Sequence, residues 1–489
     1  MSAATLFAAL AARPAGAIVL RGDEVAWDAP ALLDAIAGLE RQLRDVRVLA
    51  VQADNAPAWV AADLAALRTE TVHLPLPGFF SPAQLAHALD AAGADALLTD
   101  RPASVWALGL GFEASGSWCG LALMRRAAPA VALPVGTAKV SFTSGSTGSP
   151  KGACLSATGL LDTARAVAAR LADLPIERHL AVLPLALLLE NVAGVYAPLL
   201  RGAAIHLPGL TTLGWQGMGG FDPSALHRAA EAARAHSMIL VPELLKAWAL
   251  HLAAAGRRAP EDGVYVAVGG ARVDAELLRR ARALGVPAYQ GYGLTECGSV
   301  VSLNRPGDDG DDVGRPLDHV GVRVEAGELR VAGRAFLGYL HDAAAPAEFA
   351  TGDLGEFAAN GHVRLSGRRK NVLVTGYGRN ISPEWVEAAL LAEPAVAQAV
   401  VAGDACPHLC AVLVPMPGVA PAALRDAVAR VNHGLPDYAR IGGWIMAQPF
   451  TPHNGLATGN GRPVRAAILK HHAAALAEIY REEPIDVVL

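Results

Sequence analysis

The chain has 489 residues, a formal net charge of −5 and 53% hydrophobic residues. This length exceeds what one hydrophobic core usually supports, so two or more domains are expected. The slightly acidic balance gives no general attraction to nucleic acid or to anionic lipid, and neither is predicted as a partner. Five cysteines form no CxxC pair and are odd in number, which is typical of reduced thiols in the cytoplasm.

The longest apolar stretch spans residues 181–200 and is interrupted by Pro184, Glu190, Asn191 and Pro198. These residues are costly at a bilayer centre, which favours a buried core segment over a membrane span. The N-terminus lacks a basic region ahead of an apolar block, so no secretory signal is expected. The sequence therefore predicts a cytoplasmic protein with no integral membrane segment.

In chain order, short apolar or β-branched runs alternate with alanine-rich helical patterns. Strands are predicted at 46–51, 96–98, 239–241 and 264–268, and helices at 162–172 and 223–235. Such alternation predicts βαβ units and largely parallel sheets. Runs 327–331 and 362–365 predict a small antiparallel, β-barrel-like element. The expected fold is α/β, with a large N-terminal domain at 1–369 and a small α+β domain at 370–489.

The most informative segment is a loop rich in hydroxyls and glycines that ends in a lysine. It contains Thr143, Ser144, Gly145, Ser146, Thr147, Gly148 and Lys151. Glycines let backbone N–H groups approach an anion, hydroxyls add donors, and the lysine adds charge, so the loop suits a polyphosphate. It is not the common P-loop, because Gly152 stands where that motif has Ser or Thr. The alternative is a flexible Ser/Gly linker.

This loop resembles the phosphate loop of the adenylate-forming superfamily, which includes acyl-CoA synthetases, luciferases and adenylation domains of peptide synthetases. Four further motifs follow in the family's order, at 290–296 (QGYGLTE), 314–316 (GRP), 351–353 (TGD) and 367–387. The chain is identified as a member of that superfamily, most similar to bacterial long-chain fatty-acid acyl-CoA synthetases. The resemblance implies activation of a carboxylic acid with ATP and Mg²⁺ to acyl-AMP, with release of pyrophosphate and then transfer to CoA.

The resemblance also implies residue roles. Tyr292 would stack on adenine, Thr295 would donate to the α-phosphate, and Glu296 would hold Mg²⁺. Asp353 and Arg368 would bind the ribose. Outside this context Tyr292 reads as a core aromatic, Glu296 as a helix cap, and Thr-Gly-Asp as a turn.

Two more residues are implied to act with the small domain, which is mobile in the family. Lys370 would be the hinge about which that domain turns. Arg379 would then approach the phosphate or line the CoA channel, although an arginine in a glycine-bounded loop is more often a solvated surface charge.

The chain departs from the family near its C-terminus. A lysine normally bridges the substrate carboxylate and the phosphate there, and Arg462 stands at the aligned position. A guanidinium keeps the charge but has a different reach and geometry. Adenylation could be slower, differently positioned or lost. We expect an active enzyme with Lys151, Thr295, Glu296 and Arg462 as its catalytic groups.

The acyl substrate is less defined. Residues 183–194 and 380–383 resemble the corresponding segments of fatty-acid members, which favours a medium-chain or long-chain fatty acid. The first segment is equally compatible with core packing, and Trp215, Met218 and Phe221 would suit a narrower pocket or an aryl acid. The acceptor is CoA or the phosphopantetheine of an acyl carrier protein, and a third hypothesis is a non-catalytic relative impaired by Arg462.

The predicted small domain contains one candidate set of metal ligands. Cys406, His408 and Cys410 carry ligand atoms at short spacing. They adjoin a strand-like run at 411–414, so we expect ordinary side chains there and no metal.

Overall fold

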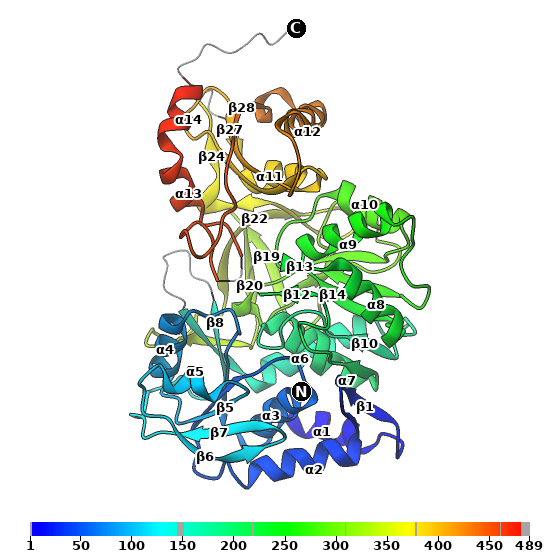
Figure 1. The fold of residues 1–489 in the computed structure, drawn as a ribbon, viewed down its shortest axis with the longest axis vertical. Helices are drawn as coiled ribbons and strands as arrows, with labels where there is room; N and C mark the ends of the chain where they lie inside the picture. The colour runs from blue at the N-terminus through cyan, green and yellow to red at the C-terminus, as the bar shows by residue number, and fades with distance from the viewer. Residues whose placement is uncertain are drawn as a thin grey trace.

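The computed structural model describes residues 2–143, 151–217, 220–308, 310–376, 379–459 and 461–480. A large lobe carries a smaller C-terminal lobe at one end of its long axis (Figure 1). The predicted α/β fold is confirmed, with parallel-sheet layers in the large lobe and a small α+β lobe after them.

One layer of the large lobe is a mixed sheet of eight strands, in which β8, β4, β3 and β5 run parallel. In spatial order the strands are β21 (Phe336–Tyr339), β9 (Lys151–Ser156), β8 (Thr137–Thr143), β4 (Val72–Pro75), β3 (Val48–Gln52), β5 (Ala96–Thr99), β7 (Leu121–Arg125) and β6 (Glu113–Trp118).

The other layer is a sheet of nine strands, parallel from β16 through to β1. The order is β18 (Arg315–Pro316), β17 (Ser302–Leu303), β16 (Ala288–Tyr292), β15 (Tyr265–Val268), β14 (Ser237–Leu240), β10 (Arg178–Leu180), β11 (Ala204–His206), β1 (Ile18–Arg21) and β2 (Ala26–Asp28). A hairpin of β12 (Trp215–Gln216) and β13 (Gly220–Phe221) lies apart.

Helices cover both sheets and fill the space between them. They are α1 (Ala3–Ala11), α2 (Ala29–Glu40), α3 (Pro57–Thr69), α4 (Pro82–Ala91), α5 (Pro102–Trp106), α6 (Ala157–Arg170), the π-helix η1 (Glu190–Tyr196), α7 (Ala197–Arg201), α8 (Pro223–Ala233), α9 (Pro242–Ala254) and α10 (Ala275–Ala283). The largest apolar cluster joins α3 and α6 to strands of both sheets. Helix α3 is buried continuously from Pro57 to Ala66, which explains why every face of this segment is apolar apart from Asp63.

The antiparallel element predicted near the end of the large lobe is a four-stranded sheet. Its order is β19 (Gly321–Glu325), β20 (Glu328–Ala332), β22 (Phe349–Phe357) and β23 (Val363–Arg368). The register of β22 and β23 sets Asp353 directly opposite Arg368. Short 3-10 turns lie at η2 (Thr295–Cys297) and η3 (Arg369–Asn371).

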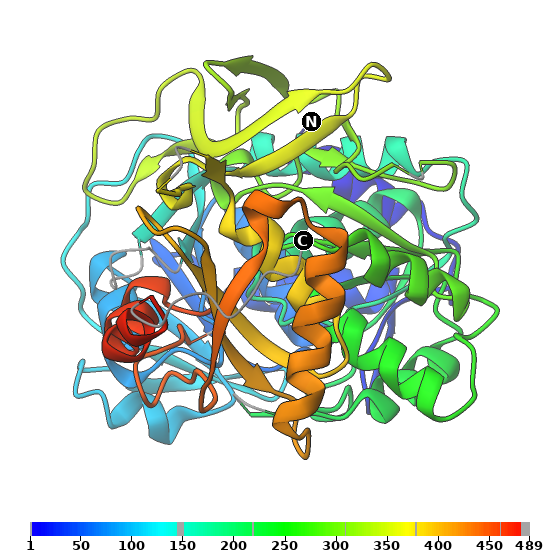
Figure 2. The same cartoon turned by 90° about the horizontal axis from the view of Figure 1, so that it is seen from above.

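The C-terminal lobe is a three-stranded sheet with helices on both faces. Its elements are β24 (Leu373–Val374), β25 (Asn380–Ile381), α11 (Pro383–Ala392), β26 (Val396–Ala402), β27 (Leu409–Pro415), α12 (Pro421–Gly434), η4 (Asp437–Ala439), β28 (Ile441–Met446), α13 (Arg465–His471) and α14 (Ala473–Ile479). Val401 packs toward α11 and α12 while Val400 packs toward α13 and α14, as strand alternation requires. Figure 2 shows α12 and α14 on opposite sides of this sheet.

The predicted elements are present, with shifted ends. The helix predicted to start at 162 begins at Ala157, because the Ser156 hydroxyl accepts a hydrogen bond from the Gly159 N–H and caps it. The apolar stretch 181–200 contributes largely buried core residues. Among the described residues, no helix combines the length and the apolar character needed to cross a bilayer. The boundary between 369 and 370 and the cytoplasmic location stay predictions.

Candidate active site

The predicted phosphate loop connects two paired strands. β8 and β9 are antiparallel neighbours, and Thr143 stands opposite Lys151 at their open end. Ser144, Gly145, Ser146, Thr147 and Gly148 lie outside the described residues. The ladder therefore fixes where the loop leaves and returns to the sheet.

Tyr292, Asp353 and Arg368 form one network across the strands β16, β22 and β23. Asp353 accepts from the Tyr292 hydroxyl through Oδ2 at 2.7 Å and from Arg368 Nε through Oδ1 at 2.8 Å. Burial, and then the carboxylate, raise the pKa of Tyr292 well above its ordinary value, so its hydroxyl stays a donor. The structure thus brings together the three side chains predicted to meet adenine and ribose.

Glu296 and Lys151 meet at a residue that the sequence analysis missed. The Tyr339 hydroxyl donates to Glu296 Oε1 at 2.7 Å, and the Lys151 ammonium lies 5.2 Å from the centre of the Tyr339 ring. Lys151 Nζ is also 3.8 Å from Asp342 Oδ2, and both of these side chains are more than half exposed. Tyr339 follows a glycine in a short strand, a pattern with no chemical signal of its own.

The two networks adjoin one another. Burial raises the pKa of the Cys297 thiol, and the neighbouring carboxylates of Glu296 and Asp353 raise it further. Both carboxylates therefore act electrostatically on the same buried thiol. Thr295 lies half-buried in the same turn.

Arg462 reaches from the C-terminal lobe to the large lobe. Its Nη2 donates to the main-chain oxygen of Gly270 at 3.0 Å, just beyond β15. Surrounding protein lowers the pKa of the guanidinium by desolvation, Glu243 raises it, and Arg368 lowers it further. The side chain keeps a large accessible surface, so we assign it a full charge. Arg368, which pairs with Asp353, is therefore one of the charges that act on Arg462.

Arg379 lies apart from these groups. Its guanidinium is 5.9 Å from the centre of the Tyr438 ring, and its backbone N–H donates to Thr375 Oγ1. Lys370 lies in the 3-10 turn between β23 and β24. The predicted roles of both residues stay predictions.

The segment 183–194 is anchored by its polar residues. Glu190 is fully buried, accepts from the Leu183 N–H at 2.9 Å and lies 3.0 Å from His179 Nε2. A methyl group on Gly194 would overlap Glu190 Oε1 at 1.9 Å, so only glycine fits there. Leu189 packs beside Gly269, where an added Cβ would lie 3.6 Å from Leu189 Cδ2.

The aromatic residues suggested for an aryl pocket lie on the β12–β13 hairpin. Trp215 and Phe221 pack edge to face with ring centres 5.6 Å apart, and Trp215 Nε1 donates to the Val182 carbonyl. Met218 lies outside the described residues.

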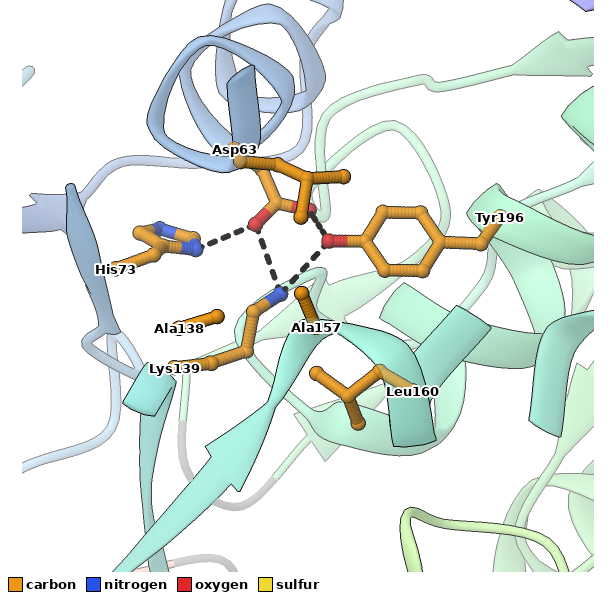
Figure 3. A pocket seen from close by; sticks show the side chains of 8 residues that line it. Asp63, His73, Ala138, Lys139, Ala157, Leu160 and Tyr196 are labelled. Carbon is orange, nitrogen blue, oxygen red and sulfur yellow. Dashed lines mark hydrogen bonds and ion pairs between the residues drawn. The ribbon is translucent and has the colours of Figure 1, made fainter. Parts of the chain in front are cut away.

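A second carboxylate network lies deep in the large lobe (Figure 3). Asp63 on α3 pairs through Oδ1 with Lys139 at 2.8 Å and with His73 at 2.5 Å. Its Oδ2 accepts from the Tyr196 hydroxyl at 2.7 Å and from Asn191 Nδ2 at 2.8 Å. All five side chains are at least 97% buried. The network thus ties α3, β4, β8 and η1 together below the start of the phosphate loop.

The charges in this network are balanced. Burial alone would raise the pKa of Asp63, but Lys139 and His73 hold it well below its usual range. Burial lowers the pKa of His73 and of Lys139, and Asp63 opposes both shifts. We read the network as one buried ion pair with neutral donors. A lone acid in an all-apolar helix pattern was the available sequence signal for Asp63.

The candidate metal ligands in the small lobe do not converge. Among the described residues, no three His, Cys, Asp or Glu side chains are grouped as a metal ion would require. Cys406 is partly accessible, Cys410 is buried, and neither is in a disulfide.

Comparison with known families identifies the class of protein. A family model described as AMP-binding enzyme matches residues 32–340, and one described as AMP-binding enzyme C-terminal domain matches 370–484. The chain belongs to the AMP-binding enzyme family, which confirms the resemblance to adenylate-forming enzymes.

Curated relatives match over parts of their length. Long-chain-fatty-acid–CoA ligase FadD15 of Mycobacterium bovis is 37% identical over 30% of this chain and 26% of its own length. The 2-succinylbenzoate–CoA ligase of Bacillus velezensis is 31% identical over 55% of this chain and 56% of its own length. The chain thus spans less than two thirds of these relatives in the matches.

The fold is shared with solved structures along most of the chain. The anthranilate CoA ligase AuaEII in complex with anthranoyl-AMP superimposes with a TM-score of 0.81 at 18% identity, covering 97% of this chain and 98% of that one. At this low sequence identity, the superposition supports a shared fold and nothing further.

Proposed function

We propose that this protein uses ATP and Mg²⁺ to convert a carboxylic acid to an acyl-adenylate, releasing pyrophosphate, and then transfers the acyl group to CoA. Membership of the AMP-binding enzyme family supports the first step. The names of the relatives, which are CoA ligases for two different acids, support the second.

The observation that carries the proposal is the unfilled acceptor capacity of Asp353. Its two oxygens take one hydrogen bond each, from Arg368 and from Tyr292. A carboxylate offers about four acceptor sites. In the described part of the chain, each oxygen therefore keeps room for another donor, and the two vicinal hydroxyls of a ribose supply two. The Tyr292 ring is half-buried beside them, in reach of an adenine face.

The first step brings an anionic carboxylate to an anionic phosphate, so the residues must neutralise charge and align the groups. A carboxylate oxygen forms a bond to the α-phosphorus, and the bond to pyrophosphate breaks. Arg462 is the cation that the C-terminal lobe brings to the end of β15, and Lys151 stands where the phosphate loop returns to the sheet. Thr295 would supply a hydroxyl donor.

The donor set fits a magnesium ion, which would offset phosphate charge when bound. Glu296 presents a carboxylate, the ligand type that Mg²⁺ prefers. Tyr339 occupies Oε1 and fixes the orientation of the group. We assign Glu296 as the residue that holds the ion.

In the second step a thiol sulfur bonds to the acyl carbon, AMP departs as the carbon–oxygen bond breaks, and the thiol proton passes to solvent. We propose that the lobe beyond Lys370 turns between the steps and carries Arg379 to the CoA path. The domain limits, 1–369 and 370–489, belong to this proposal.

The acid we propose is a medium-chain or long-chain fatty acid. Apolar Leu187 and Leu189 in the 183–194 segment, and the 380–383 motif, favour an aliphatic chain. An aryl acid is the second candidate, because Trp215 and Phe221 form an aromatic pair on the adjacent hairpin. Transfer to a carrier protein and a relative impaired by Arg462 remain the other hypotheses.

A pyrophosphate-release screen over fatty and aryl acids tests the proposal, with thioesters identified by mass when CoA or a carrier protein is supplied. We expect acid-dependent pyrophosphate and a thioester with CoA. Glu296→Ala should abolish release, while Glu356→Ala, an exposed carboxylate on β22, should leave it unchanged.

Two outcomes would redirect the assignment. A thioester formed only with a carrier protein would replace CoA as the acceptor. No release from the native chain, with release gained by Arg462→Lys, would identify an impaired relative.

A further inference from the structure

Lys246 belongs to the large lobe, and its ammonium donates hydrogen bonds to the C-terminal lobe. It projects from α9, and its Nζ donates to the main-chain oxygens of Leu391 at 2.5 Å, Glu393 at 2.6 Å and Val396 at 2.5 Å. These oxygens belong to the end of α11 and the turn into β26. In Figure 1 α11 lies beside α10, above and to the left of α9.

The chemistry of this contact is specific. An ammonium has three donors and no acceptor, and three carbonyl oxygens satisfy all of them. The C-terminal end of a helix carries partial negative charge, which a cation stabilises. Lys246 is 9% exposed. Water therefore donates few hydrogen bonds to these oxygens while the lobes are in contact.

Neighbouring contacts join the same surfaces. Arg280 Nη1 on α10 donates to the Ala392 oxygen at 3.3 Å. The Ala392 side chain is buried within the apolar cluster of α8, α9 and α10, although the residue belongs to α11. The end of α11 is therefore seated in the large lobe.

The loop that contains Arg462 also packs against the large lobe. Arg462 donates to the Gly270 oxygen. A Cβ added to Gly459 would lie 3.0 Å from the Phe79 oxygen, so the loop backbone approaches the segment before α4 closely. Both contacts require the C-terminal lobe to keep its present orientation.

We infer that Lys246 is a positioning residue that holds the C-terminal lobe in the orientation that presents Arg462 to the end of β15. The inference rests on the proposed function where it concerns Arg462 in adenylation. Lys246 touches no reacting group. It acts because separation of the lobes breaks the hydrogen bonds that its amine donates to these main-chain oxygens.

A distance measurement on the full-length chain tests the orientation without any substrate. Exposed Cys119 serves as one labelling site in the large lobe, and Arg425→Cys on the exposed face of α12 provides the second, with Cys406→Ser to prevent labelling there. In this background Lys246→Met keeps side-chain length but leaves three carbonyl oxygens without their donor. We expect a broader distribution of distances and a docked population reduced about tenfold or more.

The matched control is Arg279→Met on α10, an exposed cation whose ion pair lies within its own helix. It should give the native distribution. Lys246→Gln, which can still donate, should give an intermediate one and serves if Lys246→Met does not fold. A native distribution in Lys246→Met would overturn the inference.

Kinetics then separate positioning from general damage. Acid-dependent pyrophosphate release should fall about tenfold or more in Lys246→Met, while thioester formation from a supplied acyl-adenylate should change less than about twofold. Equal loss in both steps would contradict the assignment to Arg462. If the native chain adenylates no acid, the proposed function fails, but the distance measurement still decides the role of Lys246.

Discussion

Asp63 and Asp353 are both buried carboxylates that accept from a tyrosine and face a cation, yet they differ in what surrounds them. Asp63 has four side-chain partners that are at least 97% buried: two hydrogen-bond donors on Oδ2, and the ion-pair contacts of Lys139 and His73 on Oδ1. Asp353 has two side-chain donors, and its partner Arg368 is 45% exposed. A buried carboxylate whose oxygens are fully occupied by protein partners stabilises the fold. A carboxylate with fewer partners, at the junction of strands, can still accept hydrogen bonds from a ligand.

The largest effect expected from this difference is on stability. Asp63→Ala leaves Lys139 buried without its counter-charge, and we expect a loss of about 3–5 kcal/mol in the free energy of unfolding. Asp353→Ala leaves its cation in contact with water and should cost less than about 2 kcal/mol. Urea denaturation of the two variants checks this.

A double variant sharpens the result. Asp63→Leu with Lys139→Met removes both charges together, so it should be more stable than Asp63→Ala. Equal losses for Asp63→Ala and Asp353→Ala would contradict the contrast between the two networks.

The second effect is on nucleotide binding. Asp353→Ala removes the acceptor proposed for the ribose hydroxyls, and we expect affinity for ATP to fall about 100-fold. Calorimetric titration measures this. Asp318→Ala, an exposed carboxylate with a 3.8 Å contact to Arg165, is the control and should bind as the native chain does. Unchanged affinity in Asp353→Ala would remove the ribose role.

A third, smaller effect concerns Tyr339. Tyr339→Phe keeps the ring beside Lys151 but removes the hydrogen bond to Glu296. We expect the Mg²⁺ concentration for half-maximal pyrophosphate release to rise about tenfold. Stability should change by about 1 kcal/mol. An unaltered Mg²⁺ requirement, determined by metal titration, would mean that Glu296 is held in place without Tyr339.

The smallest effect is a pH dependence at the contact between the lobes. Burial lowers the pKa of Lys246 to about 8; Glu393 and Glu243 raise it, and Arg280 lowers it. A lobe that undocks returns Lys246 to water and to its ordinary value of 10.5. Between about pH 8 and 10.5 the undocked form therefore binds more protons, so docking strengthens as pH rises through this window. Loss of the charge removes its desolvation cost, while the neutral amine still donates hydrogen bonds to the carbonyl oxygens.

The distance distribution of the labelled chain at pH 7.5 and 9.5 measures this. The ratio of docked to undocked chain should increase several-fold in the native background and stay constant in Lys246→Met. If the docked population of the native chain fell as the pH rises, the charged amine would hold the lobes together better than the neutral one.

The hydrophobic pattern predicted the fold class, and the resemblance to a family proposed that Tyr292, Asp353 and Arg368 bind one nucleotide. The structure brings these three side chains together. The sequence did not predict Tyr339, Lys246 or Asp63. Each of these acts through a partner more than 40 residues away in sequence or through main-chain oxygens, and neither leaves a local pattern. It indicated that the stretch that contains Glu190 is buried core, and the structure uses this buried carboxylate to anchor the chain.

The pairing of β22 with β23 limits how this protein can vary. Asp353 and Arg368 face each other only at the present alignment of the two strands, which includes a bulge near Gly355 where a Cβ would lie 2.6 Å from the Arg364 oxygen. Sliding one strand by a single residue would turn either side chain to the opposite face. The turn at 358–361 should thus accept new residues at constant length, while one insertion there would separate the acid from the arginine.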